Sequence, residues 1–140
     1  MSQGTIEGAG GIVVCRRGAR SLVAVVQRSK DRLWVLPRGK LERKERPVDG
    51  AVREVVEETG HRVRVHEYVG AIAYQARGRT KVVRFWRMEA AARPSQEVMK
   101  DIVAVRWLSL AAAVRRLSYP LEKYFLQDVG RQVLRAKRHR

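Results

Sequence analysis

The sequence predicts an α/β sandwich, in which helices flank a mixed β-sheet. Two observations indicate this fold class. Short β-branched or alternating apolar segments, typical of strands, stand before and after a helical pattern near the middle of the chain. Two further helical patterns then close the chain. The length of 140 residues suits a single domain, which we expect to span residues 1–140, with a core at about residues 8–130 and a basic tail at residues 131–140.

The N-terminal segments predict a β-hairpin followed by a brief strand. Residues 8–15 and 21–27 are β-branched runs, and the polar residues between them are expected to form the turn. Residues 33–36 are a short apolar strand that Pro37 ends, so residues 38–40 are expected to be a loop.

A helix is predicted from Pro47 to the residue before Gly60. Proline suits the first turn of a helix, where its missing N–H costs nothing, and glycine is frequent just after the last turn. Apolar side chains recur at helical spacing and define a face opposite to the glutamates. The residues of this face are Val48, Ala51, Val52, Val55 and Val56.

The second half of the chain predicts three strands and two helices. The first two strands are at residues 62–74 and 80–90, joined by a turn at residues 75–79. A loop at residues 91–100 leads to a third strand at residues 102–108. A helix at residues 110–117, capped by Ser109, and a last helix from Pro120 to about residue 134 follow. The aromatic strand residues Phe85, Trp86 and Trp107 are expected to pack in the core.

Charge is the strongest compositional signal. The chain has 30 basic and 14 acidic residues and a formal net charge of +16. This excess predicts an attraction to polyanions such as nucleotides, polyphosphates, nucleic acid or acidic lipid headgroups. Charge alone does not choose among these partners.

Several other classes of protein are disfavoured by the sequence. No uninterrupted apolar run approaches the roughly 20 residues of a membrane span, and the first residues show no secretory signal. The single cysteine, Cys15, excludes an internal disulfide framework and a thiolate zinc cluster, and its apolar neighbours predict a buried strand residue. We therefore expect a cytoplasmic protein.

An acidic cluster interrupts the basic background. Six acidic residues lie within residues 42–58, and Glu54, Glu57 and Glu58 stand at i, i+3 and i+4 on the predicted helix. This spacing places the three carboxylates on one face, where they repel one another unless a cation lies between them. A solvated surface helix would instead scatter its carboxylates among basic partners. Because oxygen-only ligand sets suit hard cations, the cluster predicts a Mg²⁺ site, with Mn²⁺ as a substitute, that shares its ion with substrate phosphates.

The segment from residue 39 to residue 61 resembles the signature of the Nudix hydrolases, G-x5-E-x7-R-E-U-x-E-E-x-G-U, where U is a bulky aliphatic residue. The positions in register are Gly39, Glu45, Arg53, Glu54, Val55, Glu57, Glu58 and Gly60. His61 departs from the pattern, since it stands where a bulky aliphatic residue is usual. We expect this change to alter the local packing slightly and to leave the metal ligands intact.

The resemblance implies a Mg²⁺-dependent attack of water on a phosphorus atom of a phosphoanhydride. The implied roles are Glu54 and Glu58 as the principal metal ligands, Glu57 as a further ligand directly or through water, the carbonyl of Gly39 close to a metal, and Arg53 with Glu45 as an ion pair that orients the carboxylates. The general base is implied to be a helix glutamate or a carboxylate on a downstream loop. On that loop Glu97 is the first candidate and Asp101 the second, although a surface carboxylate is an equally good interpretation of Glu97.

The resemblance extends to two branches of the family and departs from each in one detail. Residues 34–42 and 80–86 are similar to hydrolases of diadenosine polyphosphates, and residues 105–110 to the diphosphoinositol polyphosphate phosphohydrolases. The glycine-rich segment of the inositol enzymes is missing at residues 37–40, and Tyr74 comes earlier than the tyrosine expected in dinucleoside enzymes.

We expect a small polyphosphate substrate, first of all a dinucleoside polyphosphate or a diphosphoinositol polyphosphate. The alternatives are a MutT-like pyrophosphatase of oxidised nucleoside triphosphates and an RNA-associated protein, either a decapping-type hydrolase or a nucleic-acid-binding module. Nucleic acid stays a second choice as partner, no membrane partner is expected, and the oligomeric state is open.

Four residues are expected to bind the substrate. Arg38, Lys40 and Lys81 are basic side chains predicted to contact the phosphates, and Tyr74 is predicted to stack on a base. Further basic candidates are Arg77, Arg79 and Arg84. Phe85 is a second candidate for stacking on a base, although core packing is its expected role. Strand alternation allows only some of these side chains to face the cleft.

Overall fold

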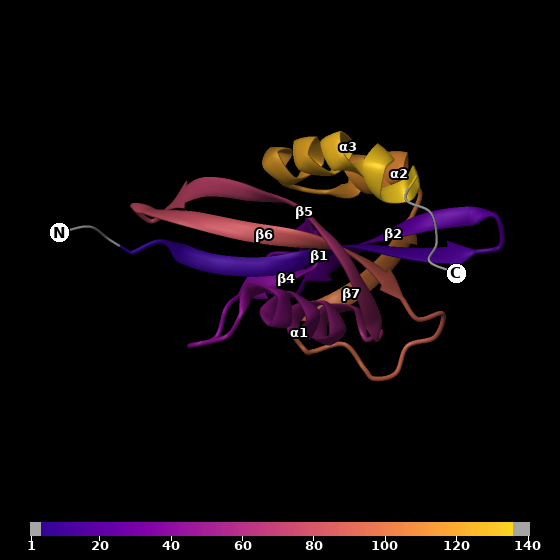
Figure 1. Ribbon diagram of the computed structural model, residues 1–140, viewed down its shortest axis with the longest axis horizontal. Coiled ribbons are helices and arrows are strands. Elements are labelled where there is room, and N and C mark those ends of the chain that lie inside the picture. The colour runs from indigo at the N-terminus through magenta and orange to yellow at the C-terminus, as the bar shows by residue number, and fades with distance from the viewer. Residues whose placement is uncertain (1–3, 136–140) are drawn as a thin grey trace.

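A twisted β-sheet lies between two helical layers in the computed structural model, which describes residues 4–135 (Figure 1). Helix α1 (Pro47–Thr59) lies on one face of the sheet, and helices α2 (Leu110–Arg116) and α3 (Pro120–Arg135) lie on the other. The sheet is mixed, because one of its strand pairs is parallel and the others are antiparallel. The predicted fold class, an α/β sandwich with a mixed sheet, is confirmed.

Seven strands make up the sheet in the described part of the chain. They are β1 (Ile6–Arg17), β2 (Arg20–Arg28), β3 (Trp34–Val35), β4 (Arg38–Lys40), β5 (Val63–Ala76), β6 (Arg79–Ala90) and β7 (Ile102–Leu108). The main order is β3-β2-β1-β6-β5, with β4 paired to β1 and β7 paired to β2. The parallel pair is β1 with β6, so the first and second halves of the chain meet along the centre of the sheet.

The prediction of a loop at residues 38–40 is wrong, because these residues form strand β4. In the antiparallel register, Arg38 lies opposite Gly10 and Gly39 opposite Ala9. A Cβ atom at Gly10 would overlap the carbonyl oxygen of Pro37 and the side chain of Arg38. The absence of a side chain at Gly10 therefore lets the two backbones come together, and the segment after Pro37 stays extended.

The hairpin between β5 and β6 is tighter than predicted. The strands continue to Ala76 and from Arg79, so the turn contains only Arg77 and Gly78. Both turn residues have positive φ, 54° and 75°. This conformation matches the right-handed twist of the two strands, and it lets pairing extend further than the expected turn at residues 75–79.

Two apolar clusters fill the space between the sheet and the helices. Strand alternation sends Ile12 to the cluster that contains residues of α2 and α3, and Val13 to the cluster that contains residues of α1. Phe85 is fully buried in the first cluster, and Trp86 and Trp107 pack against the second, as expected for core aromatic residues.

The helix ends follow the predicted local signals. Pro47 begins α1, and Gly60 ends it in the left-handed conformation with φ 76°. The hydroxyl of Ser109 caps α2 by accepting the N–H of Ala112 at 3.2 Å. Helix α3 runs into the predicted basic tail as far as Arg135, and residues 136–140 lie outside the described residues.

Two further observations bear on the predicted classes. Cys15 is buried on β1, as predicted. Among residues 4–135, no helix has the length and the apolar character needed to cross a bilayer.

Candidate active site

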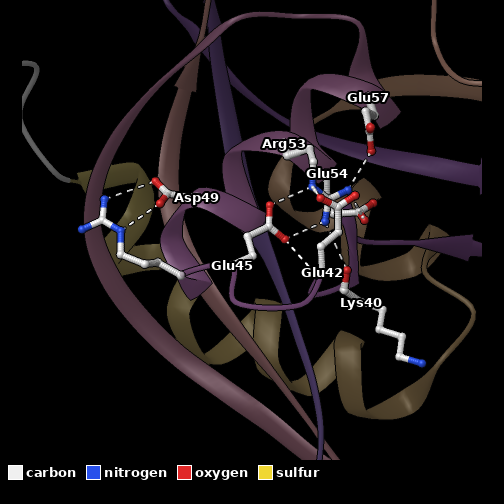
Figure 2. A network of polar contacts seen from close by, with 8 residues as sticks. Lys40, Glu42, Glu45, Asp49, Arg53, Glu54 and Glu57 are labelled. Carbon is white, nitrogen blue, oxygen red and sulfur yellow. Dashed lines mark hydrogen bonds and ion pairs between the residues drawn. The ribbon is translucent and has the colours of Figure 1, made fainter.

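Arg53 on α1 organises the acidic cluster (Figure 2). Its Nε and Nη2 atoms donate to the two carboxylate oxygens of Glu45 at 2.8 and 2.9 Å. Its Nη1 atom donates to Glu54 at 2.9 Å and to Glu57 at 3.1 Å. One guanidinium group therefore fixes three carboxylates, and the ion pair expected between Arg53 and Glu45 is present.

The same contacts tie the segment before the helix to the helix itself. Nη2 of Arg53 also donates to the carbonyl of Lys40 at 3.2 Å, and the N–H of Glu42 donates to Glu45 at 2.9 Å. The hydrogen bonds from Arg53 lower the pKa of Glu45 to about 2. Glu45 is thus ionised over the whole physiological range, and it anchors both Arg53 and the loop.

Glu58 lies in a different environment from the carboxylates that Arg53 binds. One of its oxygens accepts the backbone N–H of Arg38 on β4 at 3.1 Å. Burial raises the pKa of Glu58 to about 8, and the negative charge of Glu54 adds to this effect. Burial also raises the pKa of Glu54. Two neighbouring carboxyl groups are therefore both disfavoured as free anions.

Gly39 brings β4 into direct contact with the helix. A Cβ atom at this position would overlap the carboxylate of Glu54. Only glycine leaves room for that carboxylate beside the strand. The glycine at the start of the sequence motif is thus explained by the close approach of the β4 backbone to a predicted metal ligand.

The residues present fit a hard divalent cation. Every candidate ligand is an oxygen, and a bound cation would offset both the burial and the mutual repulsion of Glu54 and Glu58. As arranged within residues 4–135, no three His, Cys, Asp or Glu side chains converge on one metal position. Glu54 and Glu57 are directed to Arg53 instead. Glu54, Glu57, Glu58 and the Gly39 carbonyl stay predictions as metal ligands.

A cavity of about 320 Å³ is connected to this cluster through Arg38, which lines it and whose backbone N–H binds Glu58. Arg38, Lys81 and Tyr74, which were predicted to bind the substrate, all line it. Nζ of Lys81 lies 6.0 Å from the centre of the Tyr74 ring. Burial lowers the pKa of Lys81, and the positive charges of Arg38 and Arg28 lower it further. The cavity therefore concentrates positive charge, and it shares Arg38 with the carboxylate cluster.

Strand alternation decides which residues of β6 reach the cavity. Lys81, Val83 and Phe85 line it. Arg84 points to the other face, where it forms an ion pair with Glu7. Arg79 donates to the carbonyl of Gly4 at 2.9 and 3.1 Å.

Other candidates lie outside the cavity. Lys40 is exposed and lines a separate, open depression that includes Glu42 and Glu45. Arg77 is exposed at the tip of the β5–β6 hairpin. The structure thus brings together only some of the basic side chains that were predicted to contact phosphates.

Glu97 and Asp101 are exposed residues of the segment between β6 and β7. The backbone of this segment is bound to the end of α1, because the N–H of Ser95 donates to the carbonyl of Gly60 at 2.8 Å and that of Met99 to the carbonyl of Glu57 at 2.9 Å. The loop therefore passes close to the acidic helix. Glu97 as general base stays a prediction.

Sequence reasoning missed three residues that line the cavity: Arg28, Tyr119 and Glu122. Nη2 of Arg28 donates to the hydroxyl of Tyr119 at 2.7 Å. Glu122 is buried and accepts a hydrogen bond from Arg38. In the sequence, Glu122 follows Pro120 as an ordinary acidic residue of a first helical turn, so no local signal marks it.

His61, which departs from the family pattern, packs behind the end of α1. Its ring is buried, contacts Trp107 edge-on with 5.1 Å between the ring centres, and places Nδ1 2.7 Å from the carbonyl oxygen of Ala91. These contacts indicate a packing role for the histidine.

The sequence is similar to that of known proteins. The NUDIX domain family matches residues 6–129. The 8-oxo-(d)GTP phosphatase of Mycolicibacterium smegmatis is 34% identical over 108 residues, which are 75% of this chain and 32% of that protein. A MutT-like protein of Streptomyces ambofaciens is 36% identical over 100 residues, covering 69% of this chain and 60% of that protein. The chain thus spans about a third of the length of the first relative and three fifths of the length of the second.

The fold is also shared with solved structures. A binary complex of the Ap4A hydrolase of C. elegans superposes with a TM-score of 0.80 and covers 92% of this chain and 98% of its own. The two sequences are 18% identical, so this likeness concerns the fold.

Proposed function

Because the chain belongs to the NUDIX family, we propose that it is a Mg²⁺-dependent pyrophosphohydrolase that cleaves a phosphoanhydride bond in a nucleoside polyphosphate. One observation carries this proposal. Arg38 belongs both to the carboxylate cluster, through its backbone N–H to Glu58, and to the cavity, which its side chain lines. A substrate in the cavity would therefore have its phosphates next to the acidic helix.

The residues divide the chemistry among them. A divalent cation held by Glu54 and Glu58 would supply neutralisation of phosphate charge and activation of the attacking water. Arg53 holds Glu54 in place, and Arg38 and Lys81 offer N–H donors to phosphate oxygens. A carboxylate takes the proton from water, for which Glu97 and the helix glutamates are the candidates.

The walls of the cavity favour a nucleotide over a diphosphoinositol polyphosphate. Ile72, Val83 and Phe85 provide an apolar surface, and Tyr74 provides an aromatic ring. A flat base can lie against such a surface. An inositol polyphosphate carries phosphates around its whole ring, so it would bring anionic groups against apolar side chains without compensation.

A dinucleoside polyphosphate such as diadenosine tetraphosphate is the first candidate substrate. Arg28, Arg38 and Lys81 line the cavity together with one carboxylate, that of Glu122. Arg28 also pairs with Asp31 outside the cavity lining, so two carboxylates face three basic side chains and a net positive charge remains. Three basic donors in one cavity can contact more than one phosphate group of a long chain.

Oxidised dGTP is the second candidate, because the relative that is 34% identical is named an 8-oxo-(d)GTP phosphatase. The two substrates differ in their products. Hydrolysis of diadenosine tetraphosphate by water gives ATP and AMP, whereas release of pyrophosphate from 8-oxo-dGTP gives 8-oxo-dGMP.

Product analysis with Mg²⁺ tests the proposal. The panel contains diadenosine tetraphosphate, 8-oxo-dGTP, a diphosphoinositol polyphosphate and capped RNA, each with an EDTA control. ATP plus AMP supports the first candidate, and 8-oxo-dGMP plus pyrophosphate from 8-oxo-dGTP alone supports the second. Hydrolysis of only the inositol compound, or of no compound, contradicts a nucleoside polyphosphate substrate.

A further inference from the structure

Glu122 is a buried carboxylate in the cavity to which the proposed chemistry gives no role. It lies in the first turn of α3 and is 4% exposed. One oxygen accepts the backbone N–H of Leu36 at 3.0 Å, and the other accepts Nε–H of Arg38 at 3.1 Å. Leu36 lies between β3 and β4, and Arg38 is the first residue of β4.

A buried ion pair is weak evidence for a role in stability. Removing two charged groups from water costs free energy, and apolar residues of similar size often stabilise a fold as well. The side chains of Arg38 and Glu122 are only 11% and 6% exposed. Burial raises the pKa of Glu122 although Arg38 favours its ionised form. The pair therefore calls for a reason other than packing.

The geometry of Arg38 supplies that reason. Glu122 binds only Nε, so the two terminal nitrogens of the guanidinium have no hydrogen-bond partner among the described residues. No buried side-chain nitrogen or oxygen in that part of the chain lacks a partner. The terminal nitrogens are therefore not fully buried, within a side chain that is 11% exposed and belongs to a residue lining the cavity. The backbone N–H of the same residue binds Glu58.

We propose that Glu122 is a positioning residue that holds Arg38 by Nε and thereby directs its two terminal nitrogens towards a phosphate group of the substrate. It acts across the fold, from the start of α3 to β4, whose backbone contacts the predicted metal ligands Glu54 and Glu58. Planar guanidinium groups bind phosphate through two parallel hydrogen bonds, so their orientation matters. This inference rests on the proposed function only in that the substrate carries a pyrophosphate group.

Binding of imidodiphosphate, a pyrophosphate analogue that water does not cleave readily, tests the inference by calorimetry in the presence of Mg²⁺. In Glu122→Gln we expect binding to weaken on the order of tenfold, since one charge-assisted hydrogen bond that orients the guanidinium is lost. With the preferred nucleotide, KM should rise more than kcat falls. The matched control is Glu67→Gln, which removes the ion pair between Glu67 and Arg87 (3.0 Å) outside the cavity. This control should change neither the affinity for imidodiphosphate nor the kinetic constants KM and kcat.

A double-mutant cycle separates positioning from a structural role. Arg38→Lys removes the forked donor, so adding Glu122→Gln to it should cost little more than Arg38→Lys alone. Additive losses, unchanged binding in Glu122→Gln, or an equal loss in Glu67→Gln would each overturn the inference. If Glu122→Gln does not fold, Glu122→Asp takes its place, and it should lose less affinity than Arg38→Lys; an equal or larger loss contradicts the inference.

Imidodiphosphate also separates this inference from the proposed function. If the protein binds imidodiphosphate but cleaves no nucleotide, the proposed substrate is contradicted. The double-mutant cycle of Glu122 and Arg38 then still tests the positioning role of Glu122. A native protein that binds no imidodiphosphate contradicts the inference itself.

Discussion

At the scale of single residues, glycine is needed where another group occupies the space of a side chain. Gly39 is such a position, because a Cβ atom there would overlap the carboxylate of Glu54. The sequence motif contains this glycine, but its physical reason is visible only when β4 lies against α1. The residue type was readable from the sequence, and its neighbour was not.

Gly39→Ala should therefore damage the site more than the fold. The added methyl group must displace Glu54, so we expect hydrolysis to fall at least tenfold and the free energy of unfolding to fall by about 1–3 kcal/mol, as for other overpacked sites. Gly4→Ala is the control, since its added atom would meet only Arg79 at an ordinary distance of 3.7 Å. Turnover rates and urea denaturation of the two variants provide the measurement. Equal activity in both would contradict the assigned contact.

The difference between predicted and missed site residues also has a cause at this scale. Helical spacing places Glu54, Glu57 and Glu58 on one face, so their grouping follows from local geometry. Glu122 and Arg38 are separated by 84 residues in the chain and meet only through the packing of α3 against the sheet. No local pattern encodes such a pair.

At the scale of elements, strand β4 could not be predicted from the sequence. Three residues are too few to show alternation, and Pro37 before them is typical of a loop. The strand exists because β1 offers paired backbone at Gly8–Gly10, where two glycines allow close approach. The longer elements, such as α1 and the β5–β6 pair, were predictable because their apolar residues recur with the period of a helix or a strand.

The carboxylate of Glu45 joins the loop before α1 to Arg53, which gives the stability of the protein a pH dependence. The pKa of Glu45 falls from an ordinary 4.5 to about 2 in the folded protein, because of its hydrogen bonds with Arg53. A lowered pKa contributes stability that is present above about pH 4.5 and is lost as the pH falls towards 2. The stabilisation should therefore disappear within this window.

Glu45→Gln tests this dependence in metal-free protein. The variant should unfold at a lower temperature than the native protein at pH 7, and the difference should shrink between pH 4.5 and the lowest pH at which both fold. Asp49→Asn is the matched control, because Asp49 also pairs with an arginine but is 54% exposed and should matter little. A difference in Tm that stays constant with pH would contradict the role of the Glu45 charge.

At the scale of the whole molecule, the distribution of charge links folding to substrate and metal. The chain carries a net charge of +16, yet its acidic residues concentrate where α1 meets β4. Anionic substrates are attracted by the excess of positive charge. The acidic cluster instead destabilises the metal-free fold, because Glu58 is both buried and close to Glu54. A bound cation would offset this destabilisation.

This arrangement predicts that the effect of Glu58→Gln on stability reverses with metal. The pKa of Glu58 rises from 4.5 to about 8 on folding, so its ionisation reduces stability progressively between these values. In EDTA at pH 8 or above, the neutral glutamine should therefore raise the Tm above that of the native protein. Its amide oxygen can still accept the N–H of Arg38.

With Mg²⁺ the order should invert. An ion that binds only the folded protein stabilises it by about 2.7 kcal/mol at a concentration a hundred times its Kd, which corresponds to roughly 9 °C in Tm for a domain of this size. Glu58→Gln should gain far less than the native protein, and its turnover should be mostly lost, whereas the Glu67→Gln control should gain as much as the native protein. Thermal unfolding at increasing Mg²⁺ measures all three. Equal stabilisation of Glu58→Gln and the native protein would mean that Glu58 does not hold the cation, and the ligand set would then have to be sought among Glu54, Glu57 and the backbone of β4.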